Sequence, residues 1–432
     1  MKSIKKIIVV ELKKFQTVLP RPVILFLCAL SLLFWNEQLL AMNSTQTSMQ
    51  GYINTSCGQS ESNAYTAVAC SGLSDSEIEE ISPEQTGAPK TNANRTNSAN
   101  QPVMSRMTFL RSQPVTTKVS NQKNFDDLSK MAGLSLINKG AASSDDFSKF
   151  GLWANGIFRF GNVDSTIQES KGYDYNNLGV TIGFDYAITQ DFILGTAFTY
   201  LSTSGDYVNN GGDLGADLFN GSIYASYNIT DDFYVDAMAF YGGNNYNITR
   251  NVNYTGVNAK LEGTPGGRQY GFNLTSGYGF NFQRLVVEPY VSVGYLGTDI
   301  DAYEEKEIGS TEGWTARYDA QSLTSLKTTL GALFAYNFDV PWGVLIPQVR
   351  GEWHHEFEDH GRAITTRFTG VTDQNETYTI ITENPDRDYF TFGTSVTTTL
   401  DYGITAFLAY DMLIGYNNIS SYGFTLGGRV DF

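Results

Sequence analysis

Apolar residues alternate with small or polar residues through most of the stretch 150–432. Within 178–186 every second residue is apolar, and glycine, threonine or aspartate stands between. Successive side chains of a β-strand point to opposite faces of its sheet, so this pattern gives each strand one apolar and one polar face. The stretch therefore predicts an all-β fold.

The alternating segments are longer than the five or six residues that are usual in soluble sheets. We count twelve of them, at 150–163, 173–188, 192–206, 215–229, 233–248, 268–282, 285–299, 323–338, 343–358, 387–400, 403–416 and 420–432. Short links alternate with longer connectors, which are 207–214, 249–267, 300–322 and 359–386. An even number of long strands, joined in this way and with tyrosines at their ends, is typical of a barrel in a bacterial outer membrane.

Charged residues occur in the middle of these strands, on the polar face. A soluble β-sandwich would expose that face to water and bury the apolar one. A membrane barrel turns the apolar face to lipid and encloses the polar face in a wet lumen. We therefore expect a twelve-stranded antiparallel transmembrane β-barrel. The polar residues expected to face its lumen are Arg159, Glu288, Lys327, Arg350, Glu352 and Glu356.

The overall charge narrows the possible partners. The chain has 29 Lys and Arg against 45 Asp and Glu, which gives a formal net charge of -16. A phosphate backbone would repel such a chain, so we expect no nucleic-acid partner. Charged residues make up only 17% of the sequence. Soluble globular proteins have roughly 25%, so the low content agrees with a membrane barrel.

Residues 1–41 have the composition of a secretory signal peptide. Basic residues precede an apolar run at 23–34, and Ala41 supplies a small residue after it. This order predicts export through the Sec machinery and removal of the segment. A membrane anchor is the alternative, although the run is short for the roughly 30 Å of a bilayer core.

Residues 42–123 are rich in Ser, Thr, Asn and Gln and show no apolar period. Such a segment buries too little apolar surface to offset the entropy of ordering it. We expect it to be short, exposed and largely disordered. In an oxidising compartment, Cys57 and Cys70 could form a disulfide that closes a small loop.

Residues 124–149 differ from the segment before them. Asn124 could cap a helix, apolar residues between 125 and 137 recur at near-helical spacing, and Gly140 could end it. A barrel of about twelve strands has a lumen too wide to be filled by its own side chains, yet narrow enough for one helix. We expect this linker helix to pass through the lumen.

No arrangement of residues predicts catalysis or a cofactor. All three histidines lie within 353–360, next to several acids. On a strand, however, His354 and His360 would lie roughly 20 Å apart, so they could not bind one metal ion. Neither a nucleophile elbow nor a glycine-rich phosphate loop before a helix is present. We expect no catalytic, cofactor-binding or metal-binding residues.

Several sequence segments, taken together, resemble those of a known family. These segments are RGEWHHEF at 350–357, DRDYF at 386–390, FLAYD at 407–411 and GFTLGGRVDF at 423–432. With the helix before them, they resemble the autotransporter translocator domain of type V secretion. The resemblance implies a twelve-stranded outer-membrane barrel that is inserted by the barrel-assembly machinery and exports an N-terminal passenger, here 42–123.

The resemblance also implies roles for particular residues. In this family the last strand and its terminal Phe act as an assembly signal, which falls here on Tyr422, Phe424 and Phe432. Self-cleaving members are cut at an Asn-Asn pair within the helix, and 121–124 contains no such pair. We therefore expect the passenger to stay attached.

The sequence thus predicts an outer-membrane autotransporter that displays its own passenger on the cell surface without catalysis. The alternative is a porin-like channel, for which 42–123 would be a periplasmic tail. A third possibility is that the connectors 300–322 and 359–386 bind a host surface, whose ligand the sequence does not identify.

Overall fold

The structure is a computed structural model, and its chain divides into two compact units, Met1–Met42 and Asn43–Phe432. The residues that it describes are 42–57, 74, 77–78, 81, 88–112, 150–166, 168–169, 171–254, 257–309, 314–370, 376–400 and 404–431. Every described helix and strand belongs to the second unit. The expected signal peptide, 1–41, and the expected linker helix, 124–149, lie outside the described residues.

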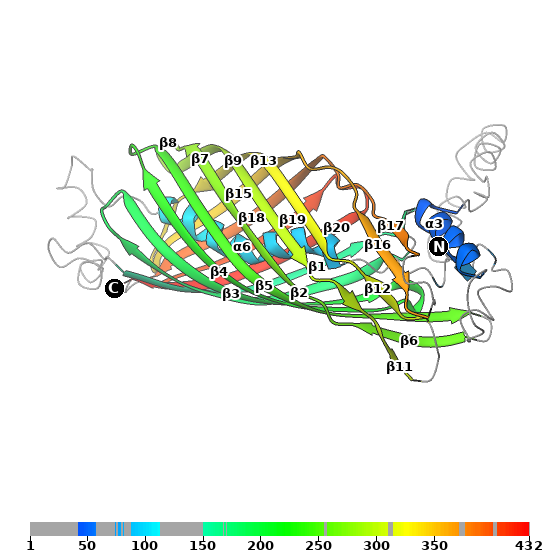
Figure 1. Cartoon of the computed structure of the whole chain (residues 1–432). Helices are drawn as coiled ribbons and strands as arrows, with labels where there is room; N and C mark the ends of the chain where they lie inside the picture. Colours follow the sequence, from blue (N-terminus) through cyan, green and yellow to red (C-terminus); the bar gives the residue numbers. More distant parts are fainter. Residues whose placement is uncertain are drawn as a thin grey trace, which may run out of the picture. The chain divides into compact units, whose positions relative to one another are not determined.

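Long antiparallel strands form a closed barrel, shown in Figure 1. Within the described residues its twelve strands are β1 (Phe150–Val163), β2 (Tyr173–Ala187), β3 (Phe192–Tyr207), β4 (Gly212–Asn228), β5 (Phe233–Tyr254), β7 (Gly266–Tyr278), β9 (Leu285–Ile300), β13 (Gln321–Tyr336), β15 (Gly343–Glu356), β18 (Asp388–Leu400), β19 (Ile404–Ile414) and β20 (Ile419–Asp431). Each strand pairs with the next, and β1 pairs with β20 to close the sheet. The expected barrel is confirmed.

The two faces of the barrel differ as the period of two predicts. On β2, Leu178 and Ile182 point outward and are 56% and 55% exposed, whereas Thr181 and Asp185 point inward and are buried. The same alternation continues on the other strands, so the outer surface carries a broad belt of exposed Leu, Ile, Val and Phe. An apolar surface of this extent requires an apolar solvent.

Shorter strands extend the barrel at both of its ends. They are β6 (Val257–Gly263), β8 (Phe280–Phe282), β10 (Tyr303–Glu304), β11 (Lys306–Ile308), β12 (Ala316–Tyr318), β14 (Phe338–Val340), β16 (Ala363–Phe368) and β17 (Tyr378–Ile381). Strands β10, β12, β16 and β17 form a separate four-stranded sheet. The three longest connectors, expected as loops, thus carry strands. They lie at the barrel end opposite the short turns, as Figure 1 shows.

The described part of the chain also holds two α-helices, α3 (Ser44–Cys57) and α6 (Ala88–Ser112), and the 3-10 turn η2 (Val208–Asn210). Asn43 caps α3: its side chain accepts a hydrogen bond from the Gln46 amide at 2.7 Å, and the Gln46 side chain accepts one from the Asn43 amide at 3.0 Å. This reciprocal pair is a capping box. No helix in the described ranges is long and apolar enough to cross a membrane.

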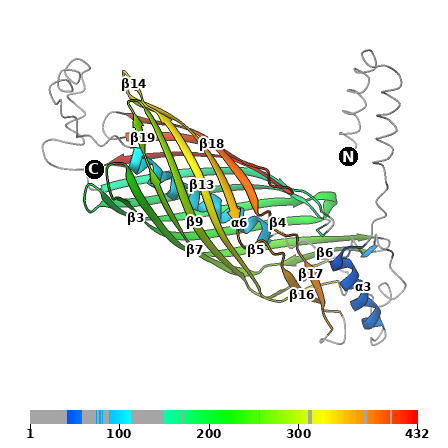
Figure 2. The ribbon, with the colours of Figure 1, turned by 90° about the horizontal axis from the view of Figure 1, so that it is seen from above.

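The expectation of disorder is therefore wrong for these two helices. Both lie in the segment 42–123, whose polar composition predicted disorder. That prediction assumed water as the only solvent for polar side chains. The polar lumen offers fixed partners to α6, which Figure 2 shows lying among the barrel strands, and the four-stranded sheet offers them to α3.

Candidate functional site

The helix α6 lies inside the barrel and contacts one side of its wall, formed by β1 to β5. Ala99, Val103 and Met107 give it a narrow apolar stripe at positions i, i+4 and i+8. Ala99 packs against Ile157 and Leu201 of the wall. The other two residues of the stripe belong to a cluster with inward-facing side chains from several strands, namely Trp153, Ala197, Tyr224, Met238, Phe240 and Leu296.

A buried ion pair fixes α6 near the short turns. Arg106 donates through Nε and Nη2 to the two carboxylate oxygens of Asp185, at 2.7 and 2.8 Å. Asp185 also accepts a hydrogen bond from the Tyr224 hydroxyl at 3.1 Å, and that hydroxyl accepts one from the Trp153 indole at 2.9 Å. The charge of Arg106 is thus paired inside a network that belongs to the barrel wall.

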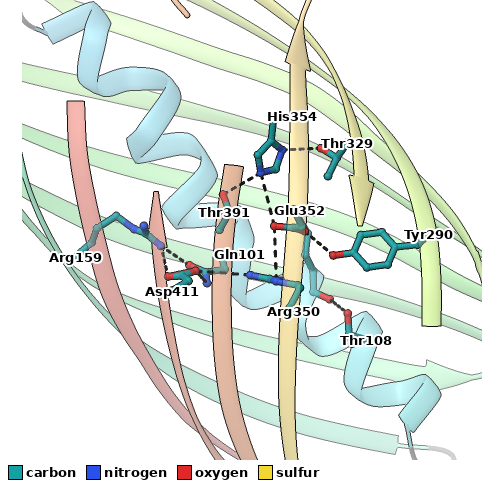
Figure 3. Close-up of polar contacts among 11 residues, drawn as sticks. Gln101, Thr108, Arg159, Tyr290, Thr329, Arg350, Glu352, His354, Thr391 and Asp411 are labelled. Atoms are coloured by element: carbon teal, nitrogen blue, oxygen red, sulfur yellow. Dashed lines mark hydrogen bonds and ion pairs between the residues drawn. The ribbon is translucent and has the colours of Figure 1, made fainter. Parts of the chain in front are cut away.

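A second polar network holds the middle of α6, as Figure 3 shows. Arg159 of β1 donates to the Gln101 side-chain oxygen and to the Asp411 carboxylate, each at 2.8 Å. The amide of Gln101 donates to the same carboxylate. The helix, β1 and β19 are therefore joined through three side chains.

The N-terminal part of α6 has further wall contacts. The Thr96 hydroxyl donates to Gln269 at 2.8 Å, and Asn220 donates to Asn100 at 3.1 Å. The guanidinium of Arg95 lies over the Tyr246 ring, 5.5 Å from its centre. Tyr246 belongs to a buried cluster at the end of the barrel with the long connectors, which also contains Val163, Tyr173, Tyr175, Tyr207, Leu214, Ala216, Ile248, Ile300 and Ile419.

The other side of the lumen holds a cavity of about 480 Å³ between α6 and the barrel wall, lined mainly by the strands β7 to β19. All six polar residues that alternation assigned to the lumen line this cavity, namely Arg159, Glu288, Lys327, Arg350, Glu352 and Glu356. Glu288 and Glu352 accept hydrogen bonds from the hydroxyls of Tyr234 and Tyr290, each at 2.7 Å. Glu356 accepts one from the Ser325 hydroxyl at 2.6 Å.

The basic groups of this cavity lie among carboxylates. Arg350 is 3.7 Å from both Glu352 and Asp411. The ammonium of Lys327 lies in the field of Glu352 and Glu356. This arrangement stabilises the charges that face the lumen.

The three histidines do not converge. His354 faces the lumen, where its ring nitrogens lie 2.9 Å from the hydroxyls of Thr329 and Thr391. His355 lies on the opposite face of the strand and contacts Asp388 at 2.8 Å. The side chain of His360 is 90% exposed. Within the described ranges, no group of three or more His, Cys, Asp or Glu could hold a metal ion.

Two of the remaining predicted site residues face away from the lumen. Tyr422 and Phe424 of the last strand are exposed on the outer face, where their rings pack against those of Phe160 and Tyr410. Phe432 lies outside the described residues. Cys57, at the end of α3, is disulfide-bonded, and its expected partner Cys70 is again not among the described residues.

Sequence reasoning missed a buried ion pair between the end of β5 and the long connector that follows β9. Arg250 donates to both carboxylate oxygens of Glu305, at 3.0 and 2.6 Å, and also to the carbonyls of Ile81 and Trp314. Ile81 precedes α6, so its carbonyl is bound at the long-connector end of the barrel.

Comparison with known proteins agrees with this architecture. The sequence profile of the family described as Autotransporter beta-domain matches residues 152–411. Outer membrane protein A of Rickettsia conorii is 27% identical over 318 residues, which are 68% of this chain and 15% of that protein. Outer membrane protein A of Rickettsia rickettsii is 28% identical over 255 residues, or 54% of this chain and 11% of that protein. The chain therefore spans less than a sixth of the length of these relatives.

A solved structure shows the same fold. The translocator domain of autotransporter NalP from Neisseria meningitidis has a TM-score of 0.52 to this chain at 15% sequence identity. The match covers 72% of this chain and 98% of that domain.

Proposed function

Because this chain belongs to the autotransporter β-domain family of the bacterial outer membrane, we propose that it carries its own N-terminal segment to the cell surface. The displayed part is the segment before α6, residues 42–87, and α6 itself stays in the lumen as the connection to the barrel. The barrel performs this transport without catalysing a reaction.

The observation that carries the proposal is the direction of α6 within the lumen. Arg106, near its C-terminus, pairs with Asp185 close to the short turn between β2 and β3. Arg95, near its N-terminus, lies over Tyr246 at the end with the long connectors. In outer-membrane barrels the short turns face the periplasm and the long loops face outward. Residues before α6 then lie outside the cell.

Two features support a segment that stays attached. The ion pair and the Gln101 network bind α6 to the wall at several points along its length. The sequence of α6 also contains no pair of adjacent asparagines, which is the site cut in self-cleaving members of the family. An open porin-like channel is not favoured, because α6 occupies part of the lumen.

The proposed partners follow from the same assignment. The apolar belt faces outer-membrane lipid, and its burial together with a closed ladder of backbone hydrogen bonds stabilises the barrel. The barrel-assembly machinery would recognise the last strand through Tyr422, Phe424 and Phe432. The Sec machinery would export the chain through the segment 1–41.

Labelling of intact cells tests the direction of transport. Asn54 is an exposed residue of α3, and Gln190 is exposed in the short turn after β2. We expect a membrane-impermeant maleimide to label Asn54→Cys on intact cells, and to label Gln190→Cys only after the outer membrane is permeabilised. The parent chain, with its natural cysteines, gives the background. Labelling of Gln190→Cys alone on intact cells would show the opposite insertion and overturn the proposal.

A further inference from the structure

The strand β17 lies at an edge of the four-stranded sheet and pairs with a neighbour on one side only. Its partner is β16, with Thr365 opposite Thr379 and Ala363 opposite Ile381. The amides of Thr379 and Ile381 point away from β16, because alternate residues of an antiparallel edge strand direct their backbone groups outward. Such a row of free donors is a template for another strand.

Side-chain oxygens occupy this row in place of a strand. The Thr379 amide donates to the Ser48 hydroxyl at 3.1 Å, and the Ile381 amide donates to the Thr45 hydroxyl at 2.9 Å. The next outward amide, that of Glu383, donates to the carboxylate of Glu169 at 3.2 Å. Two of the three acceptors therefore come from one face of α3, which lies beside β17 in Figure 1.

An aromatic contact completes the docking of α3. The Tyr52 ring packs 5.2 Å from the Tyr378 ring and 6.1 Å from the Phe368 ring. The Tyr52 hydroxyl also accepts a hydrogen bond from the Phe368 amide at 3.2 Å. Thr45, Ser48 and Tyr52 share one helical face, so a single helix covers both the edge and the adjoining rings.

If α3 were absent, the edge of β17 could pair with the same strand of a second copy of the chain. Its residues 378–382 are Tyr, Thr, Ile, Ile and Thr, which are uncharged and strongly favour strands. In an antiparallel pair with Ile380 opposite Ile380 of a second copy, Thr379 would face Ile381 and exchange both hydrogen bonds with it. No like charges face each other within these five residues.

We propose that the edge of β17 is a pairing site for the same strand of a second copy of this chain, and that α3 keeps it closed. The helix itself is weak: eight of its fourteen residues are Ser, Thr, Asn or Gly, which have low helix propensity. Its position depends on the contacts with β17 and the rings beside it, so loss of helicity exposes the edge. The inference is independent of the direction of transport.

Substitutions at Gly51 of α3 test this inference in the full-length protein. A Cβ at Gly51 meets nothing within 4 Å, so a side chain there acts on the helix alone. Gly51→Pro removes a helix hydrogen bond and breaks α3, whereas the matched control Gly51→Ala strengthens it. In detergent micelles, we expect sedimentation velocity to show that Gly51→Pro dimerises with a dissociation constant at least about tenfold lower than that of Gly51→Ala.

A second substitution identifies the surface that pairs. Ile381→Pro removes one outward amide and leaves the hydrogen bonds to β16, because a proline is tolerated where an edge amide faces away from the sheet. We expect Gly51→Pro combined with Ile381→Pro to be monomeric. A dimer that survives Ile381→Pro would show that the chains pair elsewhere and would overturn the proposal.

Hydrogen exchange separates the two halves of the inference. In Gly51→Pro, the amides of Thr379 and Ile381 should exchange at least about tenfold faster in the monomer than in Gly51→Ala. Unchanged exchange would refute the role of α3 as the cover of this edge. Faster exchange in a chain that remains monomeric at every concentration would refute pairing between copies.

Discussion

Arg106 of α6 and Asp185 of β2 form a two-point ion pair whose side chains are only 3% and 4% exposed. Their positions are 79 residues apart in the sequence. An arginine and a carboxylate that meet in this fork geometry fix both distance and orientation. The pair therefore sets how far α6 extends along the lumen, which apolar packing alone would not specify.

Removing one member of this pair should release α6. Breaking a buried ion pair by deleting one partner costs about 3–5 kcal/mol, because the other charge remains buried without compensation. We expect Arg106→Ala to lower the free energy that protects the amides of α6 from exchange by about 3 kcal/mol. Hydrogen exchange of the full-length protein in detergent measures this quantity.

The control lies one residue away. Ser105 is half-buried and takes no part in the pair, so Ser105→Ala should change protection by less than about 0.5 kcal/mol. Arg106→Ala combined with Asp185→Ala should cost less than the sum of the two single changes, since no charge remains unpaired. Additive losses would show that the two residues do not act as a pair.

A glycine of the wall is predicted to tolerate no side chain. A Cβ at Gly331 would lie 2.3 Å from the ring of Tyr290, whose hydroxyl donates to Glu352. Gly331→Ala should therefore displace Tyr290 and destabilise the barrel by about 1–3 kcal/mol, as overpacking does. The matched control is Gly351→Ala, because a Cβ at Gly351 meets nothing within 4 Å. Equal unfolding midpoints in urea for the two variants would contradict this prediction.

Deletion of 88–112 should open the lumen to ions. Among the described residues, eight carboxylates and four Lys or Arg line the cavity. A pore lined by excess acids attracts cations. We expect planar bilayers to show a several-fold rise in conductance over the full-length protein, with a preference for cations. Glu352→Gln and Glu356→Gln in the same deletion should reduce that preference, and an anion-selective pore would contradict the expectation.

The docking of α3 should weaken only at strongly alkaline pH. Burial raises the pKa of the Tyr52 phenol to about 12, from an ordinary value near 10. The folded state thus favours the neutral phenol. Its contribution to stability is complete below about pH 10 and is lost as the pH rises through the folded pKa.

Near-ultraviolet absorbance measures this ionisation. The difference between the parent protein and Tyr52→Phe should show a phenol that titrates near pH 12. A difference curve centred near the ordinary value of about 10 would show that Tyr52 is solvated rather than docked on β17.

The period of two was sufficient to predict the barrel. Each strand has lipid on one face and the aqueous lumen on the other. Whether a residue stands at an odd or an even position of the strand therefore decides which of the two it faces. Parity alone therefore assigned Arg159 and Glu352 to the lumen. The partners of these residues depend on strand register and on α6, which local sequence does not encode. The contact of Arg159 with Asp411 could not be predicted for this reason.

The helices were harder to predict, for a different physical reason. The buried apolar stripe of α6 is only Ala99, Val103 and Met107, and the first half of the helix is mostly polar. A search for apolar periodicity passes over such a segment, because its stability comes from hydrogen bonds to the wall. Asn43 and Gln46 have capping-box spacing, a signal from which the start of α3 could have been predicted. The four-stranded sheet has strands of two to six residues, too short for alternation to reveal.

The pairing of β1 with β20 has a consequence for timing. From Gly151 opposite Asp431 to Val163 opposite Ile419, the opening strand of the sheet depends on the closing one. The lumen that accommodates α6 is enclosed only once β20 has paired with β1, so α6 cannot take its place against the complete wall before β20 is present.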